Sequence, residues 1–103
     1  MDLLTDELRA RLPKLYAQEA EPEPIIYCRF FLPGTKWAWY VMEGEAKGDD
    51  FLMFGYVCGQ EKEFGYFLLS ELTAVRTRLG AAVERDLSFV EGHLTDVAPA
   101  PDS

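Results

Sequence analysis

Apolar and polar positions alternate along most of the middle of the chain, with the period of two that is typical of β-strands. The segments with this pattern are residues 25–32, 37–43, 51–58, 63–69 and 83–90. In the first of them one face is wholly apolar, so we expect that face to pack into the core. Its members are Ile26, Cys28, Phe30 and Leu32. Short turn-forming stretches join the central segments, which favours hairpins and an antiparallel sheet.

Helices are expected on either side of the strands. Leucines at every fourth position predict a helix over residues 3–12 with Thr5 as its N-cap, and residues 13–18 are expected to add a short helical segment. A second helix is expected to begin at Ser70 and to end at Gly80. The predicted fold class is α+β: an antiparallel sheet of four to five strands, an N-terminal helical segment and one helix after strand four.

Two glycines interrupt the third and fourth predicted strands. A glycine inside a strand indicates a bulge or a close approach by another backbone, and Gly55 is predicted to mark such a place. Gly65 is expected to lie near it across the sheet, where the rings of Phe54 and Tyr66 need room.

The length of the chain fits one domain. Residues 1–92 are expected to form a single α+β domain. The Ala, Pro and Asp content of the last residues predicts a flexible C-terminal tail over residues 93–103.

The charge balance changes which partners are expected. Eighteen acidic residues against ten basic ones give a formal net charge of −8, which argues against direct binding of nucleic acid. The acidity keeps a small protein soluble and is compatible with a basic protein partner. No apolar run is long enough for a membrane span and no secretory signal is present, so a cytoplasmic location is the expectation.

Cysteine and histidine positions predict neither a metal site nor a cofactor. Cys28 and Cys58 lie on different predicted strands, and no second Cys or His stands near either at a metal-ligand spacing. A disulfide between them requires neighbouring strands, whereas two buried thiols are the expectation for a cytosolic chain. The glycines do not form a phosphate-binding loop.

Three carboxylates at the ends of the central strands are candidates for chemistry. Glu43, Glu61 and Glu63 could act as acid and base or hold a divalent cation. The simpler interpretation is that they are solvated or bond to Arg85 or to tryptophan N–H groups. No histidine or third convergent ligand accompanies them, so no catalytic or metal-ligating residue is assigned.

Aromatic residues on the second strand are candidates for binding. Trp37 and Trp39 share one strand face, and Tyr40 lies on the other. One aromatic face packs the core, and the second needs a cover, which is either the N-terminal helices or a partner. Arg85, between two acids, is expected to anchor the last strand through an internal ion pair.

Several short motifs together resemble a known family. The matching residues are Leu3-Leu4-Thr5, Leu12-Pro13-x-Leu15-Tyr16, Trp37-x-Trp39-Tyr40, Glu43, Gly55, Gly59, Glu61, Glu63, Gly65-Tyr66-Phe67, Glu71-Leu72 and Glu84-Arg85-Asp86. Over about residues 1–90, the chain resembles a family of small bacterial proteins known only as a domain of unknown function. Their genes are often carried on plasmids and integrative elements. The resemblance implies a context of mobile DNA and supplies no catalytic residue.

Two classes of function follow as hypotheses. The first is a non-enzymatic, acidic protein-binding module, either a mobile-element accessory protein or an inhibitor that imitates DNA. The alternative is a small carboxylate-based or metal-dependent hydrolase, which requires Glu43, Glu61 and Glu63 to converge in one pocket. The candidate binding residues are Trp37, Trp39, Tyr40, Glu43, Glu61, Glu63 and Arg85. Both a monomer and a homodimer joined through the aromatic face are compatible with the sequence.

Overall fold

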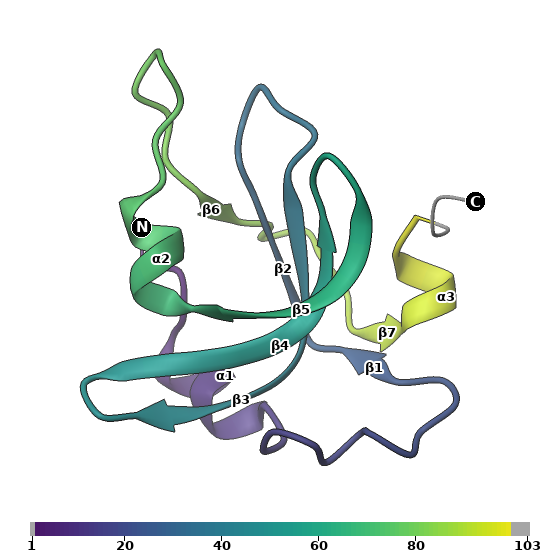
Figure 1. Cartoon of the computed structure of the whole chain (residues 1–103). Coiled ribbons are helices and arrows are strands. Elements are labelled where there is room, and N and C mark those ends of the chain that lie inside the picture. The colour runs from purple at the N-terminus through teal and green to yellow at the C-terminus, as the bar shows by residue number, and fades with distance from the viewer. Residues whose placement is uncertain (1, 100–103) are drawn as a thin grey trace.

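The chain forms an α+β domain, as predicted, in a computed structural model that describes residues 2–99. Its elements, in chain order, are α1 (Asp6–Arg11), β1 (Ile25–Ile26), β2 (Cys28–Phe31), β3 (Ala38–Lys47), β4 (Asp50–Cys58), β5 (Lys62–Leu68), α2 (Leu69–Ala74), β6 (Glu84–Arg85), β7 (Gly92–His93) and α3 (Leu94–Val97). Figure 1 shows the long β3–β4 hairpin, with β5 beside it, at the centre of the molecule.

The main sheet is antiparallel, with five strands in the order β5-β4-β3-β2-β6. The predicted strand 25–32 is divided at Tyr27, because the chain turns there from one sheet to another: β2 pairs with β3 and β6, whereas β1 pairs with β7. The helix expected after the fourth predicted strand is α2, which follows β5 directly.

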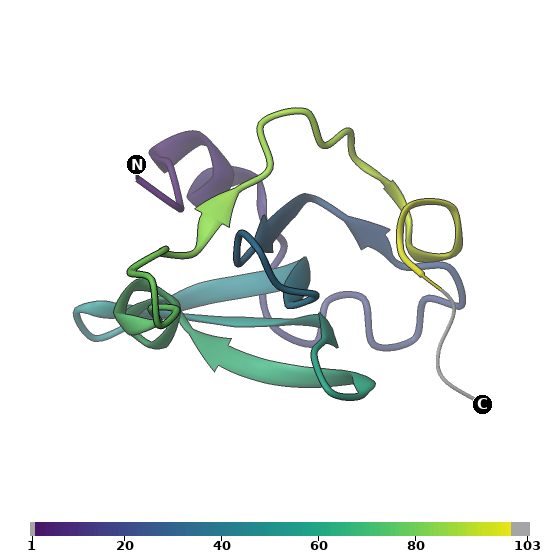
Figure 2. The same cartoon turned by 90° about the horizontal axis from the view of Figure 1, so that it is seen from above.

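The main sheet carries a hydrophobic core on each of its faces. On one face, leucines of α1 and α2 pack with Phe30, Trp39 and Met53. On the other face, Tyr40 and Tyr56 pack with side chains of the C-terminal segment, including Phe89. Figure 2 shows α1 and α3 at opposite ends of the domain. The second aromatic face of the sheet, for which a cover was expected, is therefore partly covered by the chain's own C-terminal residues.

Gly55 and Gly65 lie where the sequence predicted. They are direct partners across β4 and β5, and the register of β3 against β4 shifts between Val41 and Glu43, opposite Gly55. A Cβ atom on Gly55 would lie 2.0 Å from the carbonyl oxygen of Tyr40, so the close approach requires glycine. The prediction of a bulge or a close backbone approach at Gly55 is confirmed, and so is the prediction that the two glycines are neighbours.

The helical predictions were too long. Residues 13–18 do not continue α1 as a helix, because Tyr16 has a φ of 71° and the local N–H groups bond to carboxylates of β3. The second helix begins at Leu69 and ends at Ala74. Glu71 caps it by accepting a hydrogen bond from the Leu68 N–H, whereas Ser70, the expected cap, bonds to Asp50.

Two further boundaries differ from the predictions. The residues between the predicted strands 37–43 and 51–58 are mostly strand, because a two-residue turn at Gly48-Asp49, with Gly48 at a φ of 60°, closes the hairpin. The last strand of the main sheet covers only Glu84–Arg85 instead of residues 83–90. Within the stretch predicted as a flexible tail, the chain forms part of β7 and all of α3, and the flexibility of this stretch stays a prediction. The remainder of that prediction, residues 100–103, lies outside the described residues.

The two cysteines are buried and do not form a disulfide. Cys28 belongs to the core on one face of the sheet and Cys58 to the core on the other, with β3 between their strands. Burial raises the pKa of the Cys28 thiol to about 12, so this thiol stays protonated and is a poor nucleophile. The prediction of two buried thiols is confirmed.

Candidate functional site

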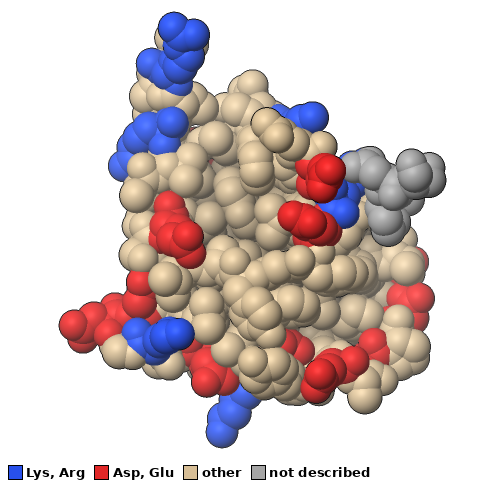
Figure 3. All heavy atoms as spheres, in the orientation of Figure 1, with Lys and Arg blue, Asp and Glu red and all other residues tan. Residues whose placement is uncertain are grey.

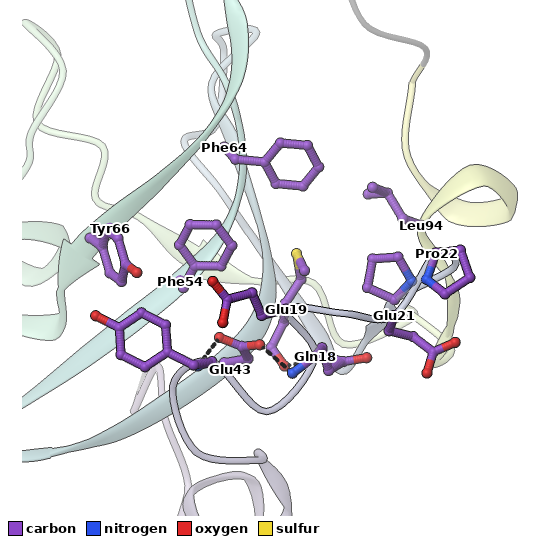
Figure 4. A pocket seen from close by; sticks show the side chains of 12 residues that line it. Gln18, Glu19, Glu21, Pro22, Glu43, Phe54, Phe64, Tyr66 and Leu94 are labelled. Atoms are coloured by element: carbon purple, nitrogen blue, oxygen red, sulfur yellow. Dashed lines mark hydrogen bonds between the residues drawn. The ribbon is translucent and has the colours of Figure 1, made fainter.

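A groove of about 350 Å³ lies between the β4–β5 hairpin and the segment that follows α1. Its lining residues are Tyr16, Gln18, Glu19, Glu21, Pro22, Pro24, Met42, Glu43, Phe54, Phe64, Tyr66 and Leu94. We call this feature the aromatic groove (Figure 4). Its lining comes from β3, β4, β5, α3 and the loop between α1 and β1.

One wall of the aromatic groove is a cluster of rings on the sheet. Phe54 of β4 lies directly opposite Tyr66 of β5, with ring centroids 4.8 Å apart. Phe64, two residues before Tyr66 on the same strand face, stacks on Phe54 at 6.1 Å. Phe64 is 50% exposed and Tyr66 is 51% exposed, so both rings meet solvent at the edge of the groove.

The opposite wall is formed by residues 16–24, and Glu43 holds this loop in place. The Glu43 side chain is 3% exposed, and its two carboxylate oxygens accept hydrogen bonds from the main-chain N–H groups of Tyr16, at 2.8 Å, and Gln18, at 2.7 Å. Figure 4 shows these bonds at the floor of the groove. Because both oxygens are occupied by the main chain, Glu43 acts here as a structural anchor.

The bulge in β3 explains why Glu43 faces the groove. Under strict alternation, Glu43 would share a face with Val41, which is fully buried under α1. The extra residue at the bulge moves Glu43 to the face of its partner Phe54. A single irregularity in the ladder, opposite Gly55, therefore places the anchoring carboxylate beneath the loop.

Gln18 secures the same loop through its side chain. Its amide nitrogen donates to the carbonyl oxygens of Met42, at 2.9 Å, and Ile25, at 3.0 Å, and its amide oxygen accepts from the Ile25 N–H at 2.7 Å. Together with Glu43, this side chain fixes the loop against both β1 and β3. The groove is therefore formed before any ligand arrives.

The electrostatics of the groove disfavour negative charge. The pKa of Tyr66 is raised, first by its hydrogen bond with the Tyr16 hydroxyl, then by burial and by the negative charges of Glu43 and Glu19. No Lys or Arg is among the residues that line the groove. The site thus combines aromatic rings with negative potential.

The predicted carboxylates do not come together. Glu61 and Glu63 line a separate hollow with Trp37, while Glu43 lies in the aromatic groove. Glu63 pairs with Val57, whose face of the sheet is opposite to that of Phe54 and Glu43. Within residues 2–99, no three His, Cys, Asp or Glu side chains form a group that could hold a metal ion.

The predicted aromatic residues are separated by the sheet. Trp39 is buried beneath α1 and α2, and Tyr40 is buried on the opposite face. Trp37 is 37% exposed, stacks on Trp39 at 5.9 Å and covers Gly59, where a Cβ would collide with its ring. Trp37 is therefore the only one of the three that reaches the surface.

Arg85 anchors β6 to the N-terminal residues. Its guanidinium donates to the carbonyl oxygens of Asp2, at 2.6 Å, and Leu3, at 2.7 Å. The neighbouring Asp86 pairs with Arg29 at 3.2 Å and accepts hydrogen bonds from Ser88, which lower the pKa of Asp86 together with the charge of Arg29. These two bonds tie β6 to the start of the chain, and the expected ion pair of Arg85 stays a prediction.

Several groove residues escaped the sequence reasoning. Phe64 and Tyr66 were predicted only as residues of the strand 63–69, although their i, i+2 spacing on a strand opposite Phe54 was the signal that could have placed them on one surface. Tyr16 was assigned to a helix. Of the predicted candidates, only Glu43 lines the aromatic groove.

The chain belongs to a family of proteins of unknown function, DUF2958, whose model matches residues 3–98. This confirms the resemblance to a domain of unknown function. The comparisons with curated proteins and with solved structures found no match. Over the described residues, no helix is long and apolar enough to cross a membrane.

Proposed function

We propose that this chain is a non-enzymatic protein-binding module and that the aromatic groove is its docking site. The observation that carries the proposal is the exposure of Phe64 and Tyr66, each about half exposed beside a preformed groove. Exposed aromatic clusters of this kind supply large, rigid contact area at protein interfaces. Tyr16 is 62% exposed, and its ring centroid lies 6.5 Å from that of Tyr66, so it extends the same surface.

The position of β5 supports recognition of an extended segment. β5 is an edge strand of the main sheet, and its exposed aromatic residues alternate with Gly65. An edge strand can pair with an added strand, whose alternate side chains then meet the pockets beside it. A partner segment that runs along β5 would place every second side chain over the aromatic groove.

The distribution of charge supports a docking groove and argues against an inhibitor that imitates DNA. An inhibitor that imitates DNA needs carboxylates spaced along one ridge. Figure 3 shows the acidic residues of this face in separate groups around a broad uncharged region. The net charge of −8 instead supports attraction of a basic partner. The chain also resembles proteins whose genes are carried on plasmids and integrative elements. We therefore propose that its partner is a cytosolic protein involved in mobile-element biology.

Selection from a displayed peptide library tests the proposal. We expect the wild-type chain to enrich a common motif, and the double variant Phe64→Ser/Tyr66→Ser to bind those peptides about tenfold more weakly or worse, because interface aromatic residues carry much of the binding energy. Leu79→Ser is the matched control: Leu79 is 99% exposed and outside the groove, so binding should be unchanged. Circular dichroism establishes that the variants fold. Equal binding by the double variant would contradict the proposal.

A further inference from the structure

The aromatic groove has the chemistry of a site for a long cationic side chain. Two kinds of surface meet in it: rings and apolar side chains that suit a methylene stem, and carboxylates that suit a positive head group. We propose that the groove takes the side chain of an arginine presented by the partner protein, with the guanidinium between the rings of Phe64 and Tyr66 and the carboxylate of Glu19. This inference rests on the proposed function and names the chemistry of the partner.

The arrangement of the rings supports a planar cation. Phe54 and Phe64 stack with an interplanar angle of 12°, whereas Tyr66 is tilted by 52° to Phe54, which leaves ring faces turned in two directions. A guanidinium stacks on aromatic faces and is more weakly hydrated than an ammonium, so arginine gains more from such a surface than lysine. The same contact occurs within this chain, where the Arg29 guanidinium lies 5.2 Å from the Phe31 ring centre and 5.5 Å from that of Tyr40.

Two of the three acidic residues that line the groove, Glu43 and Glu19, differ in role. Each oxygen of Glu43 already accepts a hydrogen bond from the loop and the side chain is buried, so we assign it a contribution of negative potential and not a direct contact with the ligand. Glu19 is exposed, and Figure 4 shows its carboxylate turned toward the rings of Phe54 and Tyr66. An apolar ligand would remove water from Glu19 without giving it a partner, whereas a guanidinium would give it one. The absence of Lys and Arg from the lining residues leaves this charge uncompensated within the groove.

The stem of the cation fits the remaining wall. The uncharged side chains of Pro22, Pro24 and Leu94 line the side opposite the rings, where Glu21 also lies. An arginine that enters along them buries its three methylene groups while its head reaches Glu19. A short amine would reach the carboxylate but leave this wall empty, so the geometry points to a protein side chain.

Nuclear magnetic resonance of the isotope-labelled full chain tests the inference with three peptides. They are acetyl-Gly-Gly-Arg-Gly-Gly-amide, the same peptide with neutral citrulline, and the same peptide with norleucine. At peptide concentrations up to about 50 mM, suited to a single weakly bound side chain, we expect the arginine peptide to shift the signals of Glu19, Phe64 and Tyr66. The citrulline and norleucine peptides should bind at least about threefold more weakly, because they lose the ionic contribution.

Two variants separate local charge from total charge. Glu19→Gln is expected to weaken the binding of the arginine peptide about threefold. Glu61→Gln changes the net charge equally but lies in the hollow beside Trp37, so it should leave the affinity unchanged. Equal effects of the two variants would mean that the attraction is general and would overturn the inference.

The remaining outcomes distinguish this inference from the proposed function. If norleucine binds as tightly as arginine, the groove remains a docking site for protein but the cationic assignment is wrong. If no peptide shifts the groove signals, the arginine assignment is overturned, and binding of library peptides by the wild type and not by Phe64→Ser/Tyr66→Ser still decides the docking role. If the signals shift with the concentration of the chain alone, a second copy occupies the groove and the assignment of the occupant is overturned.

Discussion

Replacing Gly55 by alanine is expected to destabilise the protein by about 3 kcal/mol or more, because the added methyl group has no space. Its carbon would lie 2.0 Å from the Tyr40 carbonyl oxygen and 3.1 Å from the Val41 Cα. These atoms belong to the main chain of β3, so a change of side-chain rotamer cannot relieve the collision. The two central strands must separate at the bulge, which disturbs the cores on both faces.

Gly65→Ala is the matched control for this prediction. Gly65 pairs directly with Gly55 across β4 and β5, yet a Cβ at Gly65 meets no atom within 4 Å. Its φ is not in the left-handed region, so we expect a change within about 0.5 kcal/mol, toward higher stability because alanine restricts the unfolded chain. Urea denaturation of both variants measures the difference. Similar stabilities of the two variants would contradict the close approach at the bulge.

Replacing Glu43 by glutamine is expected to cost about 2–4 kcal/mol in the free energy of unfolding. An amide of nearly the same shape keeps one acceptor oxygen but turns an NH₂ group toward the main-chain N–H of Tyr16 or Gln18. Because the side chain is 3% exposed, water cannot easily replace the lost acceptor. The positive φ of Tyr16 then loses the contact that stabilises it.

Glu45→Gln provides the comparison on the same strand. Glu45 is exposed and accepts a longer hydrogen bond, 3.2 Å, from the Leu15 N–H. Its substitution should change the stability by less than about 0.5 kcal/mol. Amide hydrogen exchange gives a local measurement: Tyr16 and Gln18 should exchange faster in Glu43→Gln and not in Glu45→Gln. Unchanged protection in Glu43→Gln would show that the carboxylate does not hold the loop.

Local patterns were sufficient to predict most of the sheet. Ile26, Cys28, Phe30 and Leu32 were predicted to be buried by alternation, and all four are. Gly55 was predicted to mark a bulge or a close backbone approach, because a glycine inside a strand indicates one or the other. These inferences succeeded because they depend on neighbours in the chain or on the adjacent strand.

The aromatic groove could not be predicted because each part depends on distant residues. Tyr16 leaves the helical conformation because of Glu43, which is 27 residues away. Glu43 faces the groove because of the bulge, which alternation along β3 does not reveal. Whether Phe64 and Tyr66 are covered depends on where the segment after α1 and the C-terminal residues pack. Arg85 likewise finds its acceptors at the other end of the chain.

Photocross-linking in the native cells tests the docking role of the aromatic groove most directly. A benzophenone amino acid is placed at Phe64 in one variant and at Leu79 in another, since both positions are exposed and only the first lines the groove. We predict a discrete cross-linked protein from position 64 that is absent from position 79. If position 64 yields no discrete product, or the same products as position 79, the groove is not the docking site.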